Sequence, residues 1–375
     1  VVARSLGRKV GQFLLSKYPA LAEKGYQMND FGAIVAAAAL SHDIGNPPFG
    51  HSGEKAIGDF FKTGNGRVFK DQLNEKQWQD LIDFEGNANG FKILTESKNG
   101  IEGGLRLSYA TLGAFTKYPK ESLPKKPSQQ ISDKKFGFFQ TEKDFFIEVA
   151  SELGLISNGK NGDISYLRHP LTFLVEAADD ICYTIIDFED GINMGWISED
   201  YALEYLINLV RDNINTKKYH QLSHTKERVS YLRALAIGNL IEEATRVFIE
   251  NEAFILDGKF HRSLLEKCKY EAQLNDIITL SVEKIYQSKE VVEKEIAGYQ
   301  VIADLLETFI TAVNNGHERR LSNFDKLIFL LLPNEFKEIE TTLYERIIHV
   351  CSFVATFSDS YAIQLHRKIK GIDIH

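Results

Sequence analysis

Residues 41–54 read SHDIGNPPFGHSGE and place two histidines and two carboxylates around an abrupt stop in the chain. The preceding run, residues 31–40, is almost wholly apolar and rich in alanine, which predicts a buried helix. The glycine and prolines that follow end that helix. A buried helix that ends in His42 and Asp43 needs a group to compensate the charge, and a divalent cation can bind one imidazole nitrogen and one carboxylate oxygen. The pair is therefore a candidate metal site, although an isolated His-Asp pair more often caps a helix.

A second pair of polar residues follows three positions apart. His51 and Glu54 lie on what we expect to be the next helix, where this spacing puts both side chains on one face. Gly50 and Gly53 leave room for a ligand to approach closely. A carboxylate that orients an imidazole suits general acid/base catalysis, so this pair is a candidate catalytic unit.

A third segment lies far downstream, where residues 168–187 read RHPLTFLVEAADDICYTIID. A proline near the start and an apolar stripe predict a helix here. Asp179, Tyr183 and Asp187 are spaced by four and share one face, whereas Asp180 is turned away by about 100°. A solvated acidic face would show the same spacing, but the surroundings are strongly apolar.

These segments resemble the bacterial deoxyguanosine triphosphate triphosphohydrolases of the HD-domain superfamily. The His-Asp pair alone is shared by many phosphohydrolases, and its extension to His51 and Glu54 is far more specific. Further stretches that carry the resemblance are FEGNA at 84–88, LSYATLG at 107–113, KYP at 117–119, KKFG at 134–137 and, more weakly, SDSYA at 358–362.

The resemblance implies a metal held by two histidines and two aspartates. It assigns three of these ligands to His42, Asp43 and Asp179, and it places the fourth upstream of Val1. The implied cofactor is Mn²⁺ or Mg²⁺, which would polarise a phosphoryl oxygen or activate a water. Which of the two metals is native stays open.

The resemblance also implies the reaction and the roles of other residues. His51 and Glu54 would assist the attack of water on the α-phosphorus, which releases a deoxynucleoside and inorganic tripolyphosphate. Tyr183 and Asp187 would hold the deoxyribose, and an aromatic ring against C2′ would penalise a ribonucleotide. Tyr183 could equally serve core packing, with its hydroxyl bonded elsewhere.

Basic and aromatic residues near these motifs are candidates for binding the triphosphate. As ordinary surface residues they would instead be solvated, which is the better interpretation for Lys125 and Lys126 in the loop at 121–135. Which of two adjacent lysines faces the phosphates stays open. The candidates are Lys117, Tyr118, Lys134, Lys135 and Arg168.

Periodicity and composition predict an all-α protein. Helical repeats run through residues 200–213, 226–250, 274–311 and 336–352, and we expect a mobile loop at 121–135. We predict a phosphohydrolase core at 1–200 and a helical region at 201–375 that completes the fold and forms the interface of a homo-oligomer.

Charge and cysteine content narrow the class of protein. The net charge of −8 argues against a generally basic nucleic-acid-binding surface. The apolar runs at 33–40 and 327–332 are too short to span a bilayer, and we see no signal peptide. Three scattered cysteines fit a reducing cytoplasm, where we place the protein.

Three functions from different classes follow. The first is a deoxynucleoside triphosphate triphosphohydrolase, with dGTP as the leading substrate. The second is another HD-superfamily phosphohydrolase, such as a nucleotidase or a phosphodiesterase. The third is a module that binds nucleotides or nucleic acid without catalysis. The sequence leaves open the base preference and activation by a second nucleotide or by single-stranded DNA.

Overall fold

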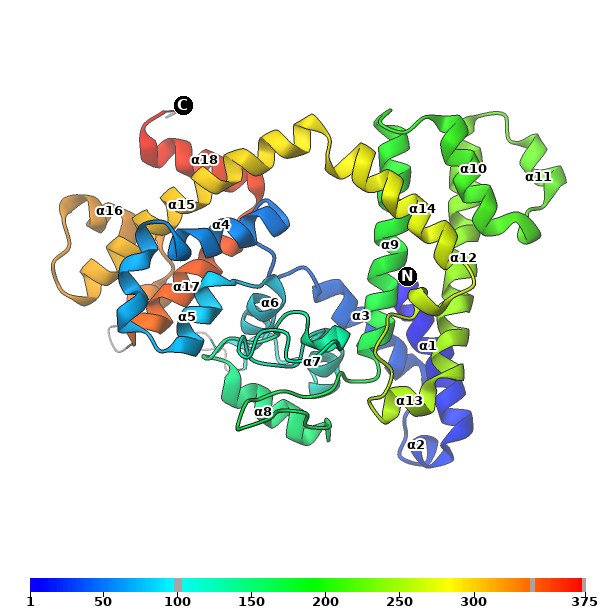
Figure 1. Cartoon of the computed structure of the whole chain (residues 1–375), viewed down its shortest axis with the longest axis horizontal. Coiled ribbons are helices and arrows are strands. Elements are labelled where there is room, and N and C mark those ends of the chain that lie inside the picture. Colours follow the sequence, from blue (N-terminus) through cyan, green and yellow to red (C-terminus); the bar gives the residue numbers. More distant parts are fainter. Residues whose placement is uncertain (98–102, 338–340, 373–375) are drawn as a thin grey trace. The chain divides into compact units, whose positions relative to one another are not determined.

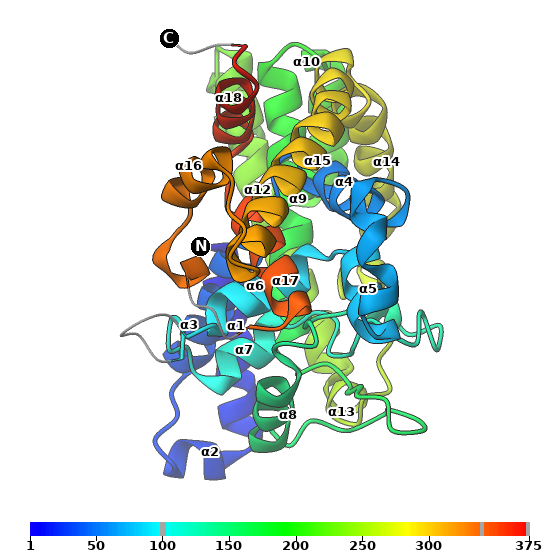
Figure 2. The same cartoon turned by 90° about the vertical axis from the view of Figure 1, so that its left-hand side faces the viewer.

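Helices make up most of the chain in the computed structural model, which describes residues 1–97, 103–337 and 341–372 (Figures 1 and 2). Over these ranges, extended pairing is limited to two isolated bridges, Lys120 with Ser165 and Ser157 with Tyr166. The all-α class predicted from the sequence is confirmed.

The described residues form two compact units that interleave along the sequence. The first unit comprises Val1–Leu40, Gly113–Lys117 and Arg168–Val292, and the second comprises Ser41–Leu112, Tyr118–Leu167 and Glu293–His375. Each unit therefore draws segments from both sides of residue 200. The proposed functional division into 1–200 and 201–375 stays a prediction.

In the first unit, α9 is the central helix and contacts α1, α10, α12 and α14. Its apolar stripe explains this position, because Leu174, Ile181 and Phe188 are fully buried. The unit contains α1 (Val2–Lys17), α2 (Pro19–Glu23), α3 (Met28–Ser41), α9 (Thr172–Asn193), α10 (Glu199–Val210), η3 (Arg211–Asn213), α11 (Thr216–Gln221), α12 (Thr225–Glu250), α13 (Glu252–Leu256), η4 (Leu265–Lys267), α14 (Glu271–Ser281) and η5 (Val282–Tyr286).

In the second unit, Ile302 and Phe309 on α15, Phe61 on α4 and Ile347 on α17 are fully buried in one hydrophobic core. The elements that lie wholly or mostly in this unit are α4 (Gly50–Lys62), η1 (Asn65–Gln72), α5 (Glu75–Ile82), α6 (Gly86–Thr95), α7 (Tyr109–Phe115), η2 (Ile131–Asp133), α8 (Lys143–Glu152), α15 (Lys289–His317), α16 (Asn323–Leu331), η6 (Asn334–Lys337), α17 (Leu343–Ala355) and α18 (Asp359–Lys370).

Two of the predicted helices differ from the structure. The stretch at 274–311 is not one helix, because α14 ends at Ser281 and a π-helical turn follows before α15 begins. This turn lets Ile285 pack on Gly191 of α9, where a β-carbon would lie 2.6 Å from the isoleucine side chain. The stretch at 336–352 corresponds to α17, which begins at Leu343, and its residues 338–340 lie outside the described ranges.

The run at 31–40 is helical, as predicted, but only partly buried. Gly32, Val35 and Ala38 on α3 are buried, whereas Leu40 is 90% exposed. The prediction of a buried helix therefore holds for one face of α3 and is wrong for the rest of it.

α15 is long and apolar enough to cross a membrane by length and hydropathy alone. The apolar runs at 33–40 and 327–332 are too short to do so. Half of the most apolar window of α15 is buried inside the protein. The buried residues Ile302 and Phe309 give this apolar face a place in the core of the second unit.

Candidate active site

The His-Asp pair lies in the turn that directly follows α3. The Nε2 atom of His42 is 3.0 Å from Oδ2 of Asp43, and the side-chain amide of Asn46 donates a hydrogen bond to Oδ1 of Asp43. The hydrogen bond from His42 lowers the pKa of Asp43. Gly45 is required in this turn because a β-carbon there would lie 2.1 Å from the backbone of Gly86. An imidazole nitrogen and an ionised carboxylate thus converge, which fits two ligands of a divalent cation.

The second pair begins α4. The backbone turns through Phe49 and Gly50, both at positive φ, and brings the side chains of His51 and Glu54 to one face. Nδ1 of His51 lies 3.3 Å from Oε2 of Glu54, and the other carboxylate oxygen of Glu54 accepts a hydrogen bond of 2.8 Å from the backbone N–H of Gly86. The imidazole is largely exposed and the carboxylate largely buried, so Glu54 is fixed while His51 faces outward.

Lys135 connects this pair to a second buried carboxylate. Its Nζ atom lies 3.6 Å from Oε2 of Glu54 and 2.8 Å from Oε2 of Glu85, whose Oε1 accepts a hydrogen bond from the side-chain amide of Asn87. Lys134 is exposed to solvent. Of the two adjacent lysines, the structure therefore brings Lys135 to the His51 and Glu54 pair. The role of Glu85 escaped the sequence analysis, although its motif FEGNA was noted there.

The contacts among His51, Glu54, Glu85 and Lys135 shift the pKa values of the three acidic and imidazole side chains. Burial would raise the pKa of Glu54, but the hydrogen bond with His51 and the charge of Lys135 lower it overall. The same hydrogen bond raises the pKa of His51 against the effect of burial. Burial and the negative charge of Glu54 raise the pKa of Glu85. Glu54 is thus held as a carboxylate that favours a proton on His51.

In the first unit, two cations surround the buried carboxylate of Glu176 on α9. The guanidinium of Arg168 donates a 2.9 Å hydrogen bond to Glu176 and another to the backbone carbonyl of Lys117, and Nζ of Lys117 is 3.2 Å from Glu176. Burial would raise the pKa of Glu176, but these charges lower it. The Arg168 side chain is only 2% exposed, and its contacts with Glu176 and the Lys117 carbonyl are structural.

The acidic face of α9 carries an aromatic pair. Tyr183 stacks on Tyr286 with 5.2 Å between ring centroids and 8° between planes, and the hydroxyl of Tyr286 donates a 2.6 Å hydrogen bond to Asp187. Asp179 and Asp180 are partly buried, and burial together with the charge of Glu176 raises the pKa of Asp180 to about 7. Asp187 is therefore not part of a freely solvated acidic face, because it is partly buried and bonded to Tyr286.

Tyr286 escaped the sequence analysis because it lies on the π-helical turn, inside a stretch predicted as one continuous helix. Its spacing from Tyr183 gives no signal in the sequence. Tyr118, the remaining candidate, is buried in the second unit.

Comparison with known proteins gives the family. No family model matches the chain. A deoxyguanosinetriphosphate triphosphohydrolase-like protein of Synechocystis is 39% identical over 386 aligned positions, which cover all of this chain and 84% of the relative. The chain belongs to the deoxyguanosinetriphosphate triphosphohydrolase family. A like-named Pseudomonas aeruginosa protein is 35% identical over 99% of the chain and 83% of the relative, and a deoxyguanosinetriphosphate triphosphohydrolase of Yersinia pseudotuberculosis is 31% identical over 75% and 62%.

Family membership confirms the resemblance on which the site was predicted. Within the described residues, no group of three or more His, Cys, Asp or Glu side chains is arranged to hold a metal ion. His42 and Asp43 belong to the second unit and Asp179 to the first. The set of three metal ligands therefore stays a prediction for this member of the family.

The hydrogen bond between His51 and Glu54 predicts how the pKa of His51 should change when Glu54 is replaced. We expect Glu54→Gln to lower the pKa of His51 toward its ordinary value of about 6.5, because the carboxylate that stabilises the imidazolium is gone. An NMR titration of the His51 ring checks this. His261→Ala, which removes an exposed histidine of the first unit, is the control, because the titration of His51 should not change in it. An unchanged His51 pKa in Glu54→Gln would mean that the two side chains do not pair in solution.

Proposed function

We propose that this protein hydrolyses deoxynucleoside triphosphates, dGTP foremost, to a deoxynucleoside and inorganic tripolyphosphate. The observation that carries the proposal is the pairing of His51 with the buried, ionised Glu54 in a member of this family. A carboxylate that orients an imidazole is the arrangement that general acid/base catalysis requires. The consequence for the cell would be control of the deoxynucleotide pool.

His51 would move the proton in this reaction. The neutral imidazole accepts a proton from water as the water oxygen bonds to the α-phosphorus, and the bond between that phosphorus and the 5′ oxygen breaks. The proton is then returned to the 5′ oxygen of the deoxynucleoside. Glu54 orients the ring and stabilises the imidazolium, and Lys135 keeps Glu54 ionised.

A divalent metal fits the donor set that the turn after α3 offers. His42, Asp43 and Asp179 are the residues of this chain that would hold it. When bound, Mn²⁺ or Mg²⁺ supplies positive charge against the phosphates and lowers the pKa of a bound water.

Other side chains would bind the substrate. The stacked rings of Tyr183 and Tyr286 present an aromatic wall beside Asp187, which suits a deoxyribose whose C2′ carries no hydroxyl. Lys117, Tyr118, Lys134 and Lys135 remain the proposed contacts of the triphosphate. Arg168 would act mainly through Glu176, whose charge it already neutralises. A cytoplasmic location, a homo-oligomer and a nucleotide or single-stranded DNA effector are further parts of the proposal.

One product assay tests the proposal. The full-length protein is incubated with Mn²⁺ or Mg²⁺ and, separately, with each of the four deoxynucleoside triphosphates and GTP, and the products are separated by ion-pair chromatography. Deoxynucleoside with tripolyphosphate is the expected result. The rates with the four deoxynucleoside triphosphates give the base preference, and the rates with dGTP and GTP give the preference for deoxyribose over ribose. Monophosphate with pyrophosphate would indicate another HD-superfamily phosphohydrolase, and binding without turnover would indicate a nucleotide-binding module.

The metal ligands are tested through metal content rather than activity alone. We expect Asp179→Ala to bind Mn²⁺ at least about tenfold more weakly, because one anionic ligand is removed. Isothermal titration calorimetry with Mn²⁺ measures this. Asp180→Ala is the matched control on the neighbouring face of α9. Wild-type Mn²⁺ affinity in Asp179→Ala, with loss in the control, would reassign the ligand to Asp180.

A further inference from the structure

The weak motif at 358–362 contains a contact that the proposed reaction does not use. Asp359 is the first residue of α18, and its Oδ1 atom accepts a 2.9 Å hydrogen bond from the backbone N–H of Phe49. The two residues are 310 positions apart in the sequence, and both belong to the second unit. A residue near the end of the chain therefore holds the turn that leads into α4.

The backbone conformation of Phe49 is unfavourable unless other contacts stabilise it. Phe49 adopts the left-handed conformation, with φ 65° and ψ 16°, and Gly50 follows at φ 56°. The left-handed conformation is unfavourable for a residue with a β-carbon, and a bulky side chain persists there only when the surroundings fix it. Phe49 is also the residue that directly precedes α4, so its conformation sets the direction in which the helix starts.

Two contacts hold Phe49, one on its backbone and one on its ring. Asp359 accepts a hydrogen bond from the backbone N–H of Phe49. The ring of Phe49 lies against Gly298 of α15, and a β-carbon added to Gly298 would come within 2.7 Å of that ring. His51 follows only two residues later and is on the first turn of α4. The direction of its imidazole therefore depends on the conformation of Phe49.

We propose that Asp359 is a positioning residue for His51, which it aligns by holding Phe49 in the left-handed turn at the start of α4. Over the residues that the structure describes, Asp359 bonds to the backbone of Phe49, whereas the imidazole of His51 and Glu54 bond to one another and to other groups, so Asp359 would act through the backbone. The catalytic consequence rests on the proposed function, whereas the hold on the turn does not.

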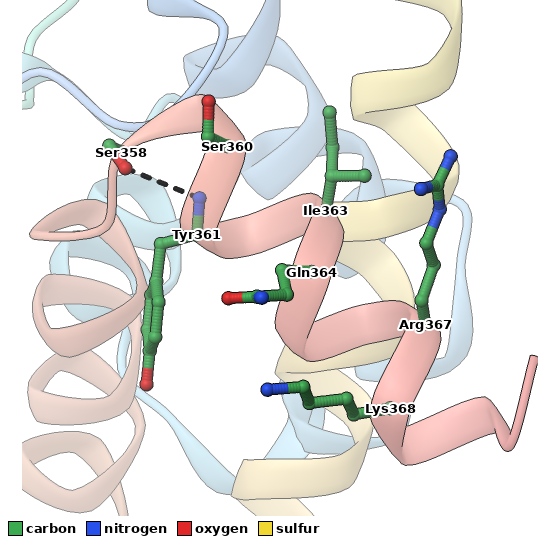
Figure 3. A pocket seen from close by; sticks show the side chains of 7 residues that line it. All are labelled: Ser358, Ser360, Tyr361, Ile363, Gln364, Arg367 and Lys368. Atoms are coloured by element: carbon green, nitrogen blue, oxygen red, sulfur yellow. Dashed lines mark hydrogen bonds between the residues drawn. The ribbon is translucent and has the colours of Figure 1, made fainter. Parts of the chain in front are cut away.

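The helix that carries Asp359 provides its own control. Figure 3 shows the N-cap of α18, where the hydroxyl of Ser358 accepts a hydrogen bond from the backbone N–H of Tyr361; Arg367 and Lys368 lie in the last turn of the same helix. Ser358→Ala removes this cap and weakens the same helix without touching Phe49. Asp359→Asn keeps an oxygen that can accept the hydrogen bond, whereas Asp359→Ala removes it.

The hold on the turn is measured without any activity assay. Hydrogen–deuterium exchange of a peptide spanning residues 46–54 should be at least about fivefold faster in Asp359→Ala than in the wild type. Asp359→Asn and Ser358→Ala should exchange at the wild-type rate. Equal acceleration in Ser358→Ala and Asp359→Ala would overturn the inference, since general loosening of α18 would then explain both.

Kinetics test the alignment of His51. With dGTP and Mn²⁺, Asp359→Ala should lower kcat about tenfold with little change in KM, because a misdirected imidazole affects the reaction more than binding. Asp359→Asn should restore kcat, and Ser358→Ala should keep it. Faster exchange with an unchanged kcat would overturn the positioning role. A wild-type protein that releases no tripolyphosphate would reject the proposed function, and the exchange result would still decide whether Asp359 holds the turn.

Discussion

If the proposed reaction is correct, we expect His51→Ala to lower turnover of dGTP by roughly 10²–10⁴-fold and to leave Mn²⁺ binding and folding intact. The magnitude is that of losing one positioned proton-transfer group. The His51 side chain is 77% exposed and pairs with Glu54 at the surface of α4, so its removal leaves no cavity in the core. Steady-state kinetics with Mn²⁺ measure the loss, and calorimetric titration with Mn²⁺ measures the retained affinity.

Ser52→Ala is the matched control for this prediction, because it truncates the next side chain on the same turn of α4. Its turnover should remain within about twofold of wild type. A His51→Ala protein with near-normal turnover would remove this residue from the mechanism. Loss of metal together with activity would instead place His51 among the ligands.

The sequence predicted features that depend only on residues close together in the chain. His51 and Glu54 are three residues apart on a helix whose start is marked by prolines and glycines, and helical geometry alone brings such side chains together. The helices at 225–250 and 199–210 were likewise visible from their periodicity, within a few residues at their ends.

What the sequence could not predict depends on tertiary packing. Glu85 and Lys135 lie near Glu54, although they are 31 and 81 positions away from it in the sequence. No periodic pattern in the sequence predicts this proximity. Tyr286 reaches Tyr183 because a π-helical turn interrupts an otherwise regular helical pattern. Such turns have no strong sequence signal, since they arise where packing, here of Ile285 on Gly191, outweighs the regular hydrogen-bond ladder.

The same distinction applies to burial. The apolar run at 31–40 predicted a helix correctly, but the prediction that this helix is buried holds only for the face that carries Gly32, Val35 and Ala38. Helix formation is decided within a few turns of the chain, whereas coverage is decided by distant segments.

Glu176→Ala is expected to destabilise the fold by about 3–5 kcal/mol at pH 7, because it leaves the buried guanidinium of Arg168 without its carboxylate partner. Urea denaturation followed by circular dichroism measures the change. Glu250→Ala is the control, since it removes an exposed i,i+4 pair with Arg246 and should cost less than about 1 kcal/mol.

The pH dependence of this loss identifies its cause. The pKa of Glu176 is lowered in the folded protein, so its ionised carboxylate stabilises the fold above its unfolded pKa of about 4.3. That contribution disappears as the pH falls through the folded pKa, and the difference between wild type and Glu176→Ala should shrink over the same range. The double variant Arg168→Met with Glu176→Leu should recover most of the lost stability at pH 7, because apolar side chains replace both charges. A double variant as unstable as Glu176→Ala, or a loss that does not depend on pH, would show that Glu176 acts through its packing volume and not through its charge.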